Sequence, residues 1–101
     1  MKRRQEPLAA THLRMARKKI ERPEDWGKGA LWHNGCYCAD GALLEAAPTG
    51  DLLRSRASSY LSAAARSRGF ETASRFNDAP GTTHADVLAL FDDAIRLARA
   101  S

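Results

Sequence analysis

β-branched residues are scarce in this chain, and their scarcity argues against any large sheet. Apart from five threonines, they are Ile20, Val87 and Ile95. Such residues fit the pleated surface of a strand, whereas Ala, Arg and Leu, the commonest residues here, are good helix formers. The sequence therefore predicts an all-α fold.

The length of 101 residues suits one domain with a single core. We expect a compact single-domain bundle over residues 8–101, preceded by a basic N-terminal arm over residues 1–7. Apolar residues recur at helical spacing in four long stretches and one short one. The expected helices are 8–21, 38–47, 51–68 and one starting after Thr83, with one or two turns over 70–76.

Residues with special backbone preferences mark the ends of these helices. Pro23 stops the first helix, and Gly69 suits the position just after the third. Thr83 and Asp86 resemble a capping box at the start of the last helix. Residues 77–81 read as a turn because they hold Asn, Asp, Pro and Gly.

The segment 23–37 is expected to be a loop or a short turn. It holds three glycines and both tryptophans, Trp26 and Trp32. Tryptophan side chains rarely remain in water, so we expect both to pin the loop onto the helices, each indole N–H finding an acceptor.

Positive charge is concentrated at one end of the chain. The net charge is +4, but residues 1–22 carry +6 and the remainder −2. A basic segment can bind phosphate or the acidic surface of a protein, although a solvated helix face gives the same pattern. The candidate binding residues are Lys2, Arg3, Arg4, Arg14, Arg17 and Lys18.

Histidines and cysteines suggest a possible zinc site. His33, Cys36 and Cys38 are close in sequence, and His84 or His12 could be a fourth ligand. Structural zinc sites usually space their cysteines by two to four residues, which this pair does not match. The alternative is a loop histidine beside two small buried thiols, with no cofactor.

Thiol catalysis is a further reading of the same region. Cys38 is expected at a helix N-terminus, where the helix dipole lowers the pKa of a thiol, with His84 as base and Asn77 or Asp78 to orient it. No nucleophile motif surrounds Cys38. The alternative is structural, because short polar side chains such as Asn77, Asp78 and Thr83 satisfy free N–H groups at helix starts.

Nothing in the sequence indicates export or a membrane span. No apolar segment follows the basic start, and no apolar run approaches the roughly 18 residues that cross a bilayer. Two cysteines one residue apart do not form a secreted disulfide framework. We therefore expect a cytoplasmic protein without a membrane partner.

Several short motifs together resemble a known family. They are Trp26 with Gly29-Ala30-Leu31, Cys38 with Gly41-Ala42-Leu43, Asn77-Asp78, and Thr83-His84 followed by Val87-Leu88 and Phe91-Asp92. In this order they resemble a family of bacterial and phage domains of unknown function, number 6197. Phe76 replaces an expected Trp, and the stretch from Leu31 to Cys38 is short. The resemblance implies an all-α fold and a setting in actinobacteria or their phages, and it implies no activity.

These observations favour a small, non-enzymatic helical module that binds another protein. In a phage or mobile element, such a module could regulate a host protein. The alternative is a nucleic-acid-binding accessory protein that uses the basic N-terminal segment. A third reading is zinc- or thiol-dependent activity at His33, Cys36, Cys38 and His84. The oligomeric state stays open.

Overall fold

The computed structural model describes residues 6–46 and 51–101, with side chains of the second range given from residue 56 onward. This part of the chain is mostly helical and confirms the expected four longer helices plus a short one. The helices are α1 (Leu8–Lys19), α2 (Ala39–Ala46), α3 (Asp51–Arg66), α4 (Ala73–Asp78) and α5 (His84–Ala100).

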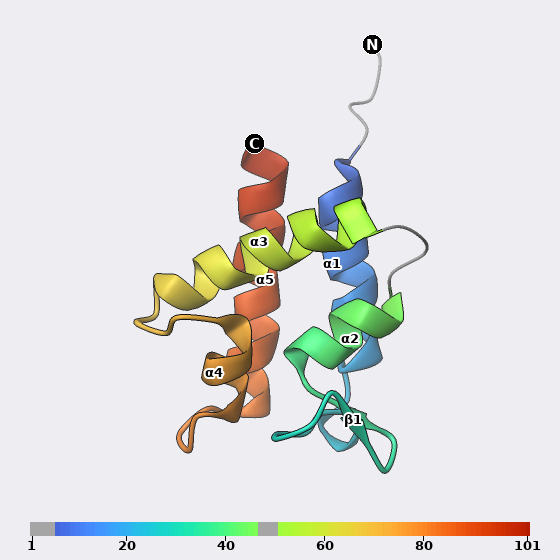
Figure 1. The fold of residues 1–101 in the computed structure, drawn as a ribbon, viewed down its shortest axis with the longest axis vertical. Coiled ribbons are helices and arrows are strands. Elements are labelled where there is room, and N and C mark those ends of the chain that lie inside the picture. The colour runs from blue at the N-terminus through green and yellow to red at the C-terminus, as the bar shows by residue number, and fades with distance from the viewer. Residues whose placement is uncertain (1–5, 47–50) are drawn as a thin grey trace.

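An antiparallel pair of helices, α1 and α5, forms the centre of the fold (Figure 1). Helix α3 crosses over both, α2 packs against α1, and α4 contacts α2 and α3. Their buried faces meet in one core, whose largest fully buried apolar side chains are Leu13, Ile20, Leu61, Leu90 and Phe91. The pairing places the beginning of α1 next to the end of α5.

Both predicted helix-end signals at the third and last helices are confirmed. The Thr83 N–H donates to Asp86 Oδ2 at 2.9 Å, and the Asp86 N–H donates to Thr83 Oγ1 at 3.2 Å, which completes a capping box. After α3, Gly69 has φ +86°, and the Phe70 N–H reaches back to the Ala65 carbonyl at 3.1 Å. Only glycine adopts this conformation without strain, so Gly69 ends the helix as expected.

Several predicted boundaries are wrong. Helix α3 ends at Arg66 rather than at residue 68, and the short helix expected over 70–76 starts at Ala73. Helix α1 ends at Lys19 rather than at residue 21, because the Ile20 N–H bonds Arg17 in a tighter turn. A 3₁₀ turn, η1 (Pro23–Asp25), follows. Asn77 and Asp78, expected in a turn, instead complete α4, and their side chains bond to other elements rather than to their own backbone.

The segment expected to be a loop contains a small hairpin of β1 (Trp32–His33) and β2 (Cys36–Tyr37). Its two turn residues, Asn34 and Gly35, have φ values of 51° and 84°. Asn-Gly is the pair that two-residue hairpin turns prefer, because both positions need positive φ. The prediction overlooked this signal.

The expectation that both tryptophans pin the loop is half right. The Trp26 indole N–H donates to Asn77 Oδ1 at 2.7 Å, and its side chain packs against the core. Trp32 is 59% exposed on the hairpin, so its role as an anchor was wrong.

Candidate functional site

An open groove between α1 and α5 brings together the predicted basic residues that the structure describes. Arg17 and Lys18 follow Arg14 on α1 by three and four positions, so both lie on the same side of the helix as Arg14. Arg96 and Arg99 face them from α5 across a groove of about 530 Å³. Lys2, Arg3 and Arg4 lie outside the described residues.

The floor and walls of the groove combine apolar surface with some acidic groups. Met15 and Ile95 supply the apolar part, and Met15 is 45% exposed. Glu21 and Asp92 supply two carboxylates. Five basic side chains and these two carboxylates line the groove, and Glu6 and Asp93 contact three of the basic groups from just outside the lining, so the excess of positive charge is small.

The carboxylates neutralise the middle of the groove. Arg17 Nε lies 2.8 Å from Asp92 Oδ1, and an Arg17 Nη lies 3.8 Å from Glu21. Arg96 pairs with Asp93 just outside the groove. Lys18 forms no ion pair within residues 6–46 and 51–101, so it remains available at the rim.

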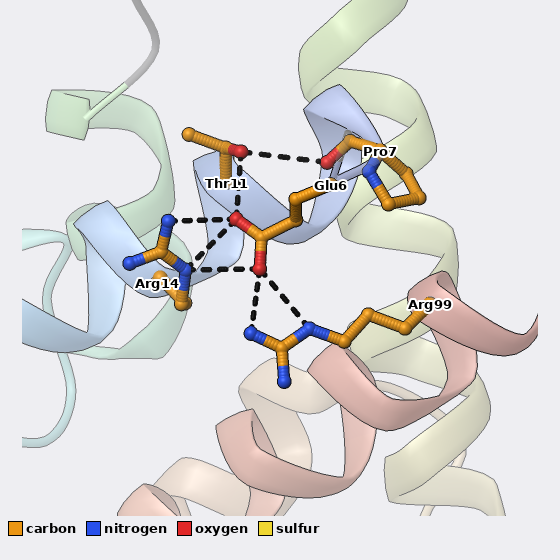
Figure 2. A network of polar contacts seen from close by, with 5 residues as sticks. All are labelled: Glu6, Pro7, Thr11, Arg14 and Arg99. Carbon is orange, nitrogen blue, oxygen red and sulfur yellow. Dashed lines mark hydrogen bonds and ion pairs between the residues drawn. The ribbon is translucent and has the colours of Figure 1, made fainter. Parts of the chain in front are cut away.

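One end of the groove holds a compact polar network around Glu6, which Figure 2 shows between Arg14 and Arg99. Arg14 donates through Nε at 2.9 Å and Nη2 at 2.7 Å to Glu6 Oε2. Arg99 donates through Nε at 3.0 Å and Nη2 at 2.5 Å to Oε1. Thr11 Oγ1 adds a bond of 2.8 Å to Oε2.

These donors stabilise the ionised form of the carboxylate. They lower the pKa of Glu6 from its ordinary value of 4.5 to about 2, with the Arg14 hydrogen bonds as the largest cause and those of Arg99 next. The network therefore shows that two guanidinium groups from distant parts of the chain can bind one carboxylate between them.

Sequence reasoning missed Glu6, Arg96 and Arg99 as members of this site. The two arginines lie near the C-terminus of the last helix, where cations complement the helix dipole, so their presence there already has a local explanation. Their spacing of three residues does place them on one face. No local pattern could show that this face lies opposite α1, because that depends on how the two helices pair.

A second polar cluster surrounds Asn77, whose side chain is fully buried. Its Oδ1 accepts from the Trp26 indole at 2.7 Å and from the Ala39 N–H at 3.0 Å. Its Nδ2 donates to the Gly27 carbonyl at 3.1 Å and to Asp78 at 2.9 Å. All four hydrogen-bonding positions of this amide are used, so Asn77 joins the loop, the start of α2 and the end of α4.

His84 also has a structural environment. Its Nε2 donates to the Ile20 carbonyl at 2.6 Å, and its ring lies 5.9 Å from that of Trp26. The structure thus gathers Trp26, Asn77 and Asp78 into one cluster, with His84 against its tryptophan, while Thr83 caps α5. These contacts agree with the structural interpretation of the motif.

The proposed zinc ligands are not assembled into a site. His33 is exposed on β1 opposite Cys36 on β2, whereas Cys38 is buried. His84 bonds Ile20, and His12 is buried with its Nε2 2.9 Å from the Leu43 carbonyl. Across the described ranges, no three His, Cys, Asp or Glu side chains are grouped so that they could hold a metal ion.

The expected activation of Cys38 is wrong in direction. Burial raises the pKa of this thiol above its ordinary value, and this effect exceeds the opposing hydrogen bond from the Gly41 N–H to Sγ at 3.3 Å. The nearby carboxylate of Asp40 also has a raised pKa, caused first by burial and then by the charge of Asp78. Cys38 therefore acts as a helix cap, with its thiol protonated.

None of the described helices is both long and apolar enough to cross a membrane. Searches of curated proteins and of solved structures found no match. The family model of DUF6197, a family of unknown function, matches residues 4–97. This match covers the Asn77 cluster and nearly all of the helical domain, and the chain therefore belongs to DUF6197.

Proposed function

We propose that this protein is a non-enzymatic module that binds another protein through the groove between α1 and α5. The observation that supports this proposal is the composition of the groove, in which five basic side chains surround an exposed apolar patch at Met15. An acidic, amphipathic segment of a partner complements both properties. A regulatory effect on a host protein is the biological role that we propose for such binding.

A protein partner fits the groove better than nucleic acid does. Glu21 and Asp92 lie within the groove, so its charge is mixed rather than uniformly basic. A nucleic acid carries a phosphate at every nucleotide, whereas a peptide can place its acidic side chains away from these two carboxylates. The exposed part of Met15 finds an apolar partner on a protein but not on a phosphate backbone. Nucleic-acid binding through the basic N-terminal segment stays the alternative function.

The surroundings of Cys38 and His84, the candidate nucleophile and base, support a function without a catalytic step. The thiol of Cys38 is buried, and its pKa is raised. His84 is held by the Ile20 carbonyl at 2.6 Å. Both groups thus have structural partners in place of the mutual contact that a thiol–imidazole pair needs.

The experiment is an affinity capture from lysate of the source organism, with and without nuclease. Wild-type protein is compared with Lys18→Glu/Arg96→Glu, which reverses two exposed charges on opposite sides of the groove. The matched control is Arg56→Glu/Arg66→Glu, which makes the same change in net charge on exposed positions of α3, outside the groove.

We expect one discrete protein to be retained by the wild type and by the α3 control, to be lost from the groove variant, and to be unaffected by nuclease. Equal retention by the groove variant would contradict the proposed surface. Recovery of nucleic acid, with proteins released by nuclease, would favour the alternative function.

A further inference from the structure

The Glu6 network has the features of a binding site that is already filled. The Glu6 side chain is 21% exposed, whereas those of Arg14 and Arg99 remain 52% and 53% exposed. The carboxylate is thus enclosed by two guanidinium groups, each of which directs its Nε and Nη2 toward it. Paired donors of this kind are the preferred way for arginine to recognise a planar carboxylate.

Side-chain hydrogen bonds, rather than backbone ones, hold Glu6 between Arg14 and Arg99. Within the part of the chain that the structure describes, its backbone forms no hydrogen bond, and α1 begins after it at Leu8 with Pro7 as the N-cap. Withdrawal of the Glu6 carboxylate therefore breaks no backbone hydrogen bond of α1. A carboxylate arriving from another molecule could accept the same bonds from Arg14, Arg99 and Thr11.

We propose that Arg14 and Arg99 form a carboxylate-binding site for an acidic side chain of a protein partner, and that Glu6 occupies this site until the partner displaces it. This inference rests on the proposed function, because the site lies at one end of the same groove, where both arginines are lining residues. Glu6 then acts as an internal competitor. The apparent affinity for an acidic partner is reduced to the extent that Glu6 fills the site.

The position of the Arg14–Arg99 pair at one end of the groove indicates where the acidic side chain of a partner should bind. Arg17 and Arg96 have carboxylate partners on α5, namely Asp92 and Asp93, which are fixed on that helix. Glu6 precedes α1 and has no such restraint. A partner is therefore expected to place a Glu or Asp side chain against the Arg14–Arg99 pair, and its apolar residues toward Met15.

The test compares Glu6→Gln with Glu24→Gln in the full chain. Both substitutions raise the net charge by one, and Glu24 also contacts an arginine, Arg22 at 3.5 Å, but lies outside the groove. The probe is a fluorescein-labelled oligoglutamate peptide of about ten residues, with binding followed by fluorescence anisotropy at low ionic strength. Thermal unfolding confirms that each variant is folded.

We expect Glu6→Gln to bind the peptide about fivefold or more tightly than Glu24→Gln does, because only the first substitution removes the competitor. Adding Arg14→Gln and Arg99→Gln to Glu6→Gln should abolish this gain. Glu6→Asp, which keeps the charge but shortens the reach to the two arginines, should give a smaller gain and serves as the test if Glu6→Gln unfolds.

Equal affinities of Glu6→Gln and Glu24→Gln would overturn the inference, as would an absence of peptide binding to a folded Glu6→Gln protein. A DNA oligonucleotide of matched charge provides a second probe. If the affinity of Glu6→Gln for DNA exceeds that of Glu24→Gln by the same factor as for the peptide, or by a larger one, the assignment of the site to carboxylates is overturned. Retention of the captured protein partner, with its loss in Lys18→Glu/Arg96→Glu, would leave the proposed function intact in each of these cases.

Discussion

His84, the first residue of α5, donates a 2.6 Å hydrogen bond to the carbonyl of Ile20, the C-cap residue of α1. At the opposite end of the same antiparallel pair, Glu6 joins the start of α1 to Arg99 near the end of α5. The two central helices are therefore linked at both ends by side chains. Between these links lies the groove that we propose as the binding surface.

The His84 bond is expected to contribute to stability. His84→Ala leaves the Ile20 carbonyl without its partner, so the free energy of unfolding should fall by about 1–2 kcal/mol. Urea denaturation followed by circular dichroism measures the change. His33→Ala is the control, because His33 is exposed on the hairpin. Equal effects of the two substitutions would contradict the structural role of His84.

Gly41 is required by the close approach of the hairpin segment to α2. A Cβ atom at Gly41 would meet the Leu31 carbonyl carbon within 2.6 Å and its oxygen closer still. Alanine normally stabilises a helix interior by about 1 kcal/mol relative to glycine. Gly41→Ala should instead destabilise the protein by about 1–3 kcal/mol, because backbone atoms must move.

Gly81→Ala is the control for that change, because a Cβ there meets no atom within 4 Å. Its melting temperature should equal or slightly exceed that of the wild type. An increase in the melting temperature of Gly41→Ala would show that α2 and Leu31 are farther apart than described.

Among the polar residues, Asn77 should make one of the largest contributions to the free energy of unfolding. Asn77→Ala leaves the Trp26 indole, the Ala39 N–H and the Gly27 carbonyl without their partner in a buried position. The expected loss is about 2–4 kcal/mol, measured by urea denaturation. A loss below about 0.5 kcal/mol, the range of ordinary surface substitutions, would contradict the described network.

Stability in acid should depend on Glu6. The folded pKa is about 2 and the ordinary value 4.5, so the unfolded state binds the proton first as the pH falls. The stabilisation from Glu6 is therefore fully present above about pH 4.5 and is lost as the pH approaches 2. The melting temperatures of the wild type and Glu6→Gln should differ most near neutral pH and converge over this interval.

The two cysteines should differ in reactivity. Cys36 is partly exposed, whereas Cys38 is 5% exposed and burial raises the pKa of its thiol. A thiol reagent should therefore modify Cys36 first in the native protein and Cys38 only on unfolding. Mass spectrometry of digested protein identifies the modified residue. Rapid native labelling of Cys38 would revive the thiol-based hypothesis.

Local signals predicted those parts of the fold that local chemistry determines. The Thr83–Asp86 capping box and Gly69 were both correctly placed, because each depends on a few neighbouring residues. Asn77 was misplaced in a turn, since its contacts come from Trp26 and from α2, far away in the sequence. The hairpin at Asn34 was missed although its signal is local.

The candidate site could be predicted only on one side. The spacing of Arg14, Arg17 and Lys18 predicts a shared helical face. The opposite side depends on the antiparallel pairing of α1 with α5, which brings Arg99 to Glu6 across 93 positions of sequence. The helical periodicity of one segment carries no information about which other helix it faces.

The different surroundings of the two tryptophans give the protein two distinguishable optical reporters. Trp26 donates to Asn77 and packs against the core, whereas Trp32 is largely exposed to water. Their emission maxima should therefore be separated, with the Trp32 contribution at longer wavelength. In Trp32→Phe the remaining emission would come from Trp26 alone. Its shift to longer wavelength would then reveal opening of the contacts around Asn77, even where the helices themselves persist.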